Sequence, residues 1–189
     1  RVKALRQGAE GEFDVGAIFW ERQMELIERQ VQDAVDKGAK VLAGGRRNPD
    51  LEGLFYEPTV LVDVTHEMDI MVDETFGPIL PIMVVKDEAE AMKLANETEY
   101  GLSSNIWTRN SAKGVKLASE LDAGSCSVND MAMAYGALEA PFGGRKNSGL
   151  GQVNGENGLL NYTFQRSVIV DTWGGLITST HYPYSLEKD

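Results

Sequence analysis

The hexapeptide Asp73-Glu74-Thr75-Phe76-Gly77-Pro78 lies between two apolar runs, and the interpretation of the chain starts from it. Pro78 has no backbone N–H and biases Gly77 away from helical angles, so the backbone here is expected to be extended or turned. In an extended backbone, Glu74 and Phe76 point to the same face. That face would offer a carboxylate acceptor beside a flat ring, which suits a ribose joined to an aromatic base. The alternative is a turn at a strand edge, with Phe76 in the core and Glu74 in solvent.

The residues before the hexapeptide predict one helix and two strands. Apolar side chains recur at spacings of three and four from Ile18 to Lys37, which indicates an amphipathic helix that ends at Gly38. Residues 40–43 are expected to form a short strand. Residues 54–64 return as a second strand, in which Pro58 indicates an edge position or a bulge.

The residues after the hexapeptide alternate between strands and helices. The run 79–85 is continuously apolar, a pattern typical of a strand that is covered on both faces. Four further elements are expected: a helix capped by Asp87, a strand over 102–108, a helix over 111–121 capped by Ser111, and a strand over 125–129. This alternation predicts right-handed βαβ units, and therefore an α/β fold with a parallel-type sheet and flanking helices.

Glycine is unusually frequent from Pro141 to Gly158. Such a stretch is either a flexible linker or a backbone that must pass close to a ligand or to another segment of the chain. Phe142 and Leu150 interrupt the small residues and disfavour the linker. A helix over 159–164 and an apolar strand over 167–172 are expected next, and the aromatic tail is expected to dock, on another subunit for example.

Composition excludes several classes of function. The chain has 189 residues, is 42% hydrophobic and 25% charged, and carries a formal net charge of −11. Nucleic acid and anionic membranes require clustered Lys and Arg, so neither is expected as a partner. No apolar run is long enough to cross a membrane and no signal segment is recognisable, so a cytoplasmic setting is expected. The chain starts without Met in a segment of helical composition, which suggests an excerpt of a longer polypeptide.

The reactive side chains form no recognisable catalytic or metal-binding pattern. Cys126 is the single cysteine and lies in an expected strand, where a thiol is usually buried and inert. The two histidines, His66 and His181, are far apart, so a metal site is not expected. Gly149-Leu150-Gly151 superficially resembles a dinucleotide-binding loop but follows no apolar strand. No phosphate-binding loop and no hydrolase triad can be assembled.

Three stretches occur in a particular order: Glu74-Thr75-Phe76-Gly77-Pro78, Asn96-Glu97-Thr98-Glu99-Tyr100-Gly101-Leu102, and Pro141-Phe142-Gly143-Gly144-Arg145-Lys146-Asn147-Ser148-Gly149. Together, in their order and separation, they resemble the motifs of the NAD(P)-dependent aldehyde dehydrogenase superfamily. The Ala123-Gly124 step and the turn that begins at Gly155 fit the same template, so the resemblance covers nearly the whole chain.

The resemblance implies roles for five residues. Glu74 would hold the hydroxyls of the nicotinamide ribose of NAD or NADP, and Phe76 would support the nicotinamide ring. Tyr135 and Phe142 would line the tunnel for the aldehyde, and Glu156 would help to relay protons. The resemblance also implies a homo-oligomer, dimer or tetramer, with residues 1–166 as part of the catalytic domain and residues 167–189 as an oligomerisation strand and tail.

The family's catalytic cysteine, general-base glutamate, oxyanion asparagine and adenosine-binding domain lie upstream of these motifs and are not among these residues. Without an attacking thiolate, no covalent adduct with an aldehyde can form, so the chain alone is expected to be inactive. Two readings remain: part of an enzyme that oxidises an aldehyde to a carboxylate, or a truncated, non-catalytic paralogue that acts as an oligomerisation module. An unrelated structural protein is a distant third.

Overall fold

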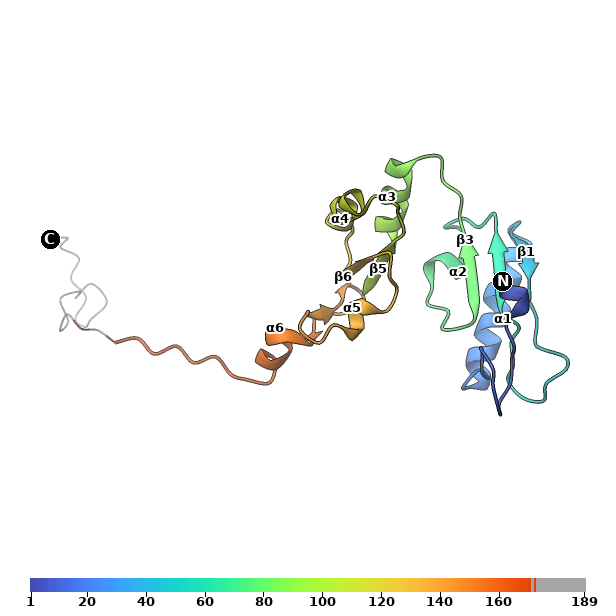
Figure 1. Cartoon of the computed structure of the whole chain (residues 1–189), viewed down its shortest axis with the longest axis horizontal. Coiled ribbons are helices and arrows are strands. Elements are labelled where there is room, and N and C mark those ends of the chain that lie inside the picture. Colours follow the sequence, from blue (N-terminus) through green and yellow to red (C-terminus); the bar gives the residue numbers. More distant parts are fainter. Residues whose placement is uncertain (171, 173–189) are drawn as a thin grey trace, which may run out of the picture.

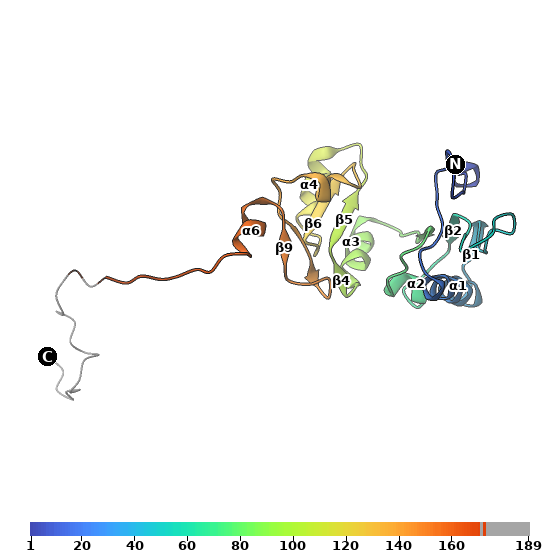
Figure 2. The same cartoon turned by 90° about the horizontal axis from the view of Figure 1, so that it is seen from below.

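The chain folds as a mixed α/β protein in the computed structural model, which describes residues 1–170 and 172. Figures 1 and 2 both show two groups of elements joined by the chain between β3 and α3. The groups also meet where the His66 Nδ1 atom lies 3.4 Å from a carboxylate oxygen of Glu97. The first group comprises a short 3-10 helix, η1 (Val2–Ala4), and then α1 (Glu21–Asp36), β1 (Lys40–Ala43), β2 (Thr59–Val62), α2 (Asp69–Val72) and β3 (Ile79–Ile82).

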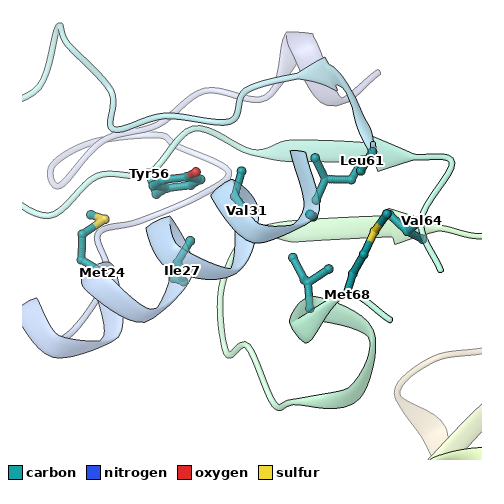
Figure 3. Close-up of a cluster of buried hydrophobic side chains, with 10 residues drawn as sticks. Met24, Ile27, Val31, Tyr56, Leu61, Val64 and Met68 are labelled. Carbon is teal, nitrogen blue, oxygen red and sulfur yellow. The ribbon is translucent and has the colours of Figure 1, made fainter. Parts of the chain in front are cut away.

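The core of the first group forms where α1 packs against a three-stranded sheet. The strand order is β1-β2-β3, with β1 antiparallel and β3 parallel to β2. Figure 3 shows apolar side chains of α1 gathered with those of the sheet and of the α2 region. The amphipathic helix is therefore confirmed, and its buried apolar residues are Met24, Ile27, Val31 and Ala34. Gly38 follows it with a φ of 105°, as expected for a residue just past a helix end.

Two details of this sheet differ from expectation. Pro58 lies just before β2 rather than inside it, and β2 is the central strand; the bulge is in β1, between Val41 and Ala43. Since proline cannot donate to a ladder, β2 begins one residue later, where the Thr59 N–H donates to the Pro78 carbonyl over 2.8 Å.

The prediction that residues 79–85 are covered on both faces is wrong for this chain. β3 is an edge strand whose residues are alternately half-buried and exposed, and Leu80 and Val84 are 53% and 82% exposed. A continuous apolar run indicates that a strand is to be buried, but it does not identify the residues that cover it.

The second group contains α3 (Glu88–Glu97), β4 (Tyr100–Gly101), β5 (Ser103–Ile106), α4 (Ser111–Ala118), β6 (Ser125–Val128), α5 (Met133–Gly136), β7 (Phe142–Gly143), β8 (Arg145–Lys146), β9 (Gln152–Val153) and α6 (Gly155–Leu160). The expected βαβ unit is confirmed because β5 and β6 are parallel and α4 connects them. The remaining pairs, β4 with β8 and β7 with β9, are antiparallel.

Helix caps and the C-terminal elements test the local predictions. The Asp87 cap is confirmed, since its carboxylate accepts from the Glu90 N–H over 2.9 Å. The cap of α4 is Asn110 rather than Ser111, because the Asn110 side chain reaches the Lys113 N–H at 3.0 Å. Helix α6 begins four residues before the expected helix over 159–164. Residues 167–170 and 172 form no strand, and the rest of the expected tail lies outside the described residues.

Candidate functional site

Glu74 and Phe76 lie in the loop between α2 and β3 and are both exposed. Phe76 is 79% exposed, so the alternative that places its ring in the core does not hold. Of the two expected backbone forms, extended or turned, the turned one is observed at Phe76, where φ is 45°, in the left-handed region. The simple alternation of side chains therefore does not apply at this residue, and neither does the same-face geometry deduced from it.

An apolar pocket of about 290 Å³ lies beside the Phe76 ring. It is lined by Phe76 and by residues at and just before the start of α1: Ala17, Ile18, Phe19, Trp20 and Gln23. The Glu74 carboxylate makes no ion pair or hydrogen bond within the described part of the chain, so it is free to accept from hydroxyl groups. An open carboxylate, an exposed ring and an apolar pocket fit a ribose that carries a flat heterocycle.

The other three predicted site residues gather in the second group. The rings of Tyr135 and Phe142 pack edge to face, with centroids 5.3 Å apart and planes at 81°. The Asn154 side chain donates to the Tyr135 carbonyl over 3.2 Å, and the Gly155 N–H donates to the Leu138 carbonyl over 2.9 Å. Glu156 follows in the first turn of α6 and is exposed.

Asp130 is a residue of this region that the sequence reasoning did not single out. Its carboxylate accepts from the backbone N–H groups of Ala132 and Met133, at 2.8 and 2.6 Å. These bonds favour the ionised form and hold the pKa of the Asp130 carboxyl below its usual value. Asp130 thus fixes the start of α5, the helix that carries Tyr135. An aspartate three residues before the first residue of a short helix was the available signal.

The second and third motif stretches contact each other, mainly through Lys146. Its ammonium group donates to the carbonyls of Asn96 and Thr98, at 2.9 and 3.0 Å, and lies 3.5 Å from an Asp122 carboxylate oxygen. These carbonyls belong to the C-terminal end of α3, where a cation is favourable. Lys146 itself has a φ of 53° on β8, which pairs with β4.

Asn96, in the last turn of α3, makes further hydrogen bonds near these contacts. Its side-chain oxygen accepts from the Asp122 N–H over 2.8 Å, and its amide donates to the Glu120 carbonyl over 2.9 Å. The Gly101 N–H in turn donates to the Ser148 hydroxyl over 3.0 Å. The two motif stretches therefore share a structural function: they join the end of α3 to the loop that carries Phe142.

Lys146→Met should lower the unfolding free energy of the protein by about 1.5–3 kcal/mol, because two charge-assisted hydrogen bonds to backbone carbonyls are lost. Chemical denaturation of the full-length protein measures this change. Lys116→Met is the matched control, since Lys116 is an exposed lysine of α4 with no ion pair among the described residues. Equal effects of the two substitutions would contradict the role of Lys146.

Close contacts with other backbone segments explain Gly143 and Gly144 of the glycine-rich stretch, and Gly124 before it. A Cβ at Gly124 would overlap the Gly143 carbonyl oxygen and lie 2.7 Å from its carbon, and a Cβ at Gly143 would lie 3.0 Å from the Gln152 Cα. A Cβ at Gly144 would lie 2.5 Å from the Ser148 carbonyl oxygen. Of the alternatives left open by the sequence, close approach to another segment of the chain is the one observed.

The remaining reactive side chains of the described residues bear on the sequence predictions for a nucleophile and a metal site. Cys126 lies on β6 and is half-buried, with its sulfur 3.9 Å from the Ser127 carbonyl oxygen. Within residues 1–170 and 172, no three His, Cys, Asp or Glu side chains are grouped so that they could hold a metal ion. No helix in that part of the chain is long and apolar enough to cross a membrane.

Comparison with known proteins identifies the family. The sequence model of the aldehyde dehydrogenase family matches residues 1–168. The chain is 45% identical over 170 residues to a protein of Mycobacterium ulcerans provisionally named succinate-semialdehyde dehydrogenase 2 (NADP+), covering 88% of the chain and 33% of that protein. It is 38% identical over 184 residues to the 4,4'-diapolycopene aldehyde oxidase of a Methylomonas species, covering 97% and 34% respectively.

A solved structure agrees with the sequence relatives. An aldehyde dehydrogenase of Mycobacterium tuberculosis complexed with NAD+ superposes with a TM-score of 0.85 at 35% identity, covering 90% of this chain and 35% of that one. The fold is that of a part of the aldehyde dehydrogenase structure. The chain belongs to the aldehyde dehydrogenase family, and it spans about a third of the length of the relatives it matches.

Proposed function

We propose that these residues form part of an NAD- or NADP-dependent enzyme that oxidises an aldehyde to a carboxylic acid. The observation that carries the proposal is the loop between α2 and β3, which exposes the open Glu74 carboxylate and the Phe76 ring with its apolar pocket, within a chain of this family. The names of the relatives support both dinucleotides, since one includes NADP+ and one solved structure contains NAD+.

Each predicted site residue has a binding or shaping role in this proposal. Glu74 accepts hydrogen bonds from the ribose hydroxyls and Phe76 supports the nicotinamide ring, while the bound dinucleotide supplies the hydride acceptor. Tyr135 and Phe142 form an aromatic wall for the aldehyde. Glu156 exchanges a proton with water near that wall. The attacking thiolate and the general base come from residues outside this chain.

The full-length protein, incubated with an aldehyde and either dinucleotide, should produce reduced cofactor, measured by its absorbance. The 189-residue chain alone should produce none, because its single cysteine lies on β6 and is not placed as a nucleophile. Cys126→Ser in the full-length protein is the control and should retain activity. Cofactor reduction by the short chain that Cys126→Ser abolishes would overturn this assignment. An inactive full-length protein would favour the oligomerisation module instead.

We also propose that residues 167–189 associate with a second copy of the protein, which would make it a homodimer or homotetramer. Val168, Ile169 and Val170 are consecutive apolar residues, each at least 73% exposed. Unpaired apolar segments of this kind invite strand pairing.

Deleting residues from Ser167 onward should therefore reduce the number of copies in the assembly. Light scattering gives this number as the mass of the assembly divided by the mass of one copy, for the full-length and the shortened protein. Val170→Asp is a milder variant that should weaken the same association. The same number of copies in all three proteins would show that the tail does not join subunits.

A further inference from the structure

Helix α1 contacts the loop of Glu74 and Phe76 at two points, one on each side of Phe76. The Gln23 side-chain amide donates a hydrogen bond to the Thr75 carbonyl. Ile27, one turn further along α1, packs against Gly77, where an added Cβ would lie 2.5 Å from the Ile27 Cδ1 atom. Residues 52 positions apart in the sequence thus fix the loop between α2 and β3.

The Gln23 bond acts on the peptide unit that precedes Phe76. The Thr75 carbonyl and the Phe76 N–H belong to one planar peptide, so a bond to that carbonyl also fixes the axis about which the φ of Phe76 turns. This φ is 45°, an unfavourable value for an aromatic residue. Such conformations persist only where the surrounding structure holds them, and Gln23 supplies a specific bond that does so.

Gln23 also lies at the apolar pocket beside the Phe76 ring. It is half-buried and lines the apolar pocket together with Phe76 and the residues before α1. A side chain in this position can transmit a change in α1 to the Phe76 ring.

We propose that Gln23 is a positioning residue for the cofactor. By holding the Thr75 carbonyl, it fixes the positions of the two neighbouring side chains, the Phe76 ring and the Glu74 carboxylate. This inference rests on the proposed function of Glu74 and Phe76. Gln23 itself takes no part in the chemistry, so its loss should disorder the loop and weaken binding without removing a reacting group.

Gln23→Met tests the proposal because it keeps the length of the side chain and removes the donor. In the full-length protein without cofactor, hydrogen exchange in residues 73–78 should become faster. The dissociation constant for the dinucleotide, measured by calorimetry, should rise about three- to tenfold, the range expected for one hydrogen bond. Gln23→Lys restores an N–H donor and should recover part of the affinity.

Gln32→Met is the matched control, since Gln32 is an exposed glutamine of the same helix that bonds only to Asp36. It should change neither exchange nor affinity. Combined with Glu74→Ala, Gln23→Met should weaken binding by less than the product of the separate effects, because both act on the same contact.

The outcomes separate the two proposals. Unchanged affinity and exchange in Gln23→Met, with weaker binding in Glu74→Ala, would overturn the role of Gln23 and leave the proposed function intact. Unchanged affinity in both variants would overturn the proposed function as well. Faster exchange with weaker binding in Gln23→Met, rescued in part by Gln23→Lys, would support the positioning role.

Discussion

Gly124→Ala should destabilise the full-length protein by about 3 kcal/mol or more, at the upper end of what overpacking costs. The added methyl group would overlap the Gly143 carbonyl oxygen and approach the Leu102 carbonyl oxygen to 3.3 Å. Both obstacles are backbone atoms, so no side-chain rotation can make room. The Gly124 N–H also donates to the Gly101 carbonyl over 2.9 Å, and moving Gly124 aside would break this bond.

Relief of the overlap requires the Gly143 segment to move away from β5 and β6. That movement would displace Phe142 and the contacts of Lys146, so the second group should lose its order before the first does. Hydrogen exchange measures this difference, with faster exchange expected in residues 100–160 than in residues 20–62.

Gly151→Ala is the matched control. Gly151 belongs to the same glycine-rich stretch, but an added Cβ would meet nothing within 4 Å, and its φ is not in the left-handed region. The unfolding free energy should therefore change by less than about 1 kcal/mol. If both substitutions lowered the unfolding free energy by similar amounts, close contact would not be the reason for glycine at position 124.

The parts of the fold that could be predicted are those set by residues close together in the sequence. Helix α1 and the parallel pair β5–β6 follow from apolar spacing and alternation, because their partners are near in the sequence. Gln30 could not be foreseen in this way. It is buried in α1, and neither polar atom of its side chain has a partner among the described residues. The exposure of β3 could not be foreseen either, since apolarity does not reveal which residues cover a strand.

The sequence selects residues for the proposed site, but it does not give their geometry. Glu74 and Phe76 were selected by the motif that surrounds them, whereas the loop with the left-handed backbone at Phe76 is contacted by Gln23 and Ile27, some 50 residues earlier. Patterns in a single sequence predict structure only among residues that are near one another along the chain. Contacts of this range, including those of Lys146 with the end of α3, become visible only in the folded structure.

Glu74→Ala in the full-length enzyme should raise the dissociation constant for the dinucleotide about ten- to 150-fold. A carboxylate that accepts from ribose hydroxyls makes charge-assisted bonds, and truncating it should remove about 1.5–3 kcal/mol of binding free energy in total. The hydride-transfer rate should fall as well, because the ribose fixes where the nicotinamide lies relative to the substrate. Calorimetry measures the affinity, and the pre-steady-state formation of reduced cofactor measures the rate.

Graded variants distinguish a ribose contact from a general effect of charge. Glu74→Gln keeps the shape and one acceptor, so it should lose less affinity than Glu74→Ala. Phe76→Ala should slow the same step by removing the support of the ring. Glu67→Ala removes another exposed carboxylate of the first group and should leave both quantities unchanged. If Glu74→Ala behaved like Glu67→Ala, Glu74 would be an ordinary solvent-exposed carboxylate, and the main support for the proposed cofactor site would be lost.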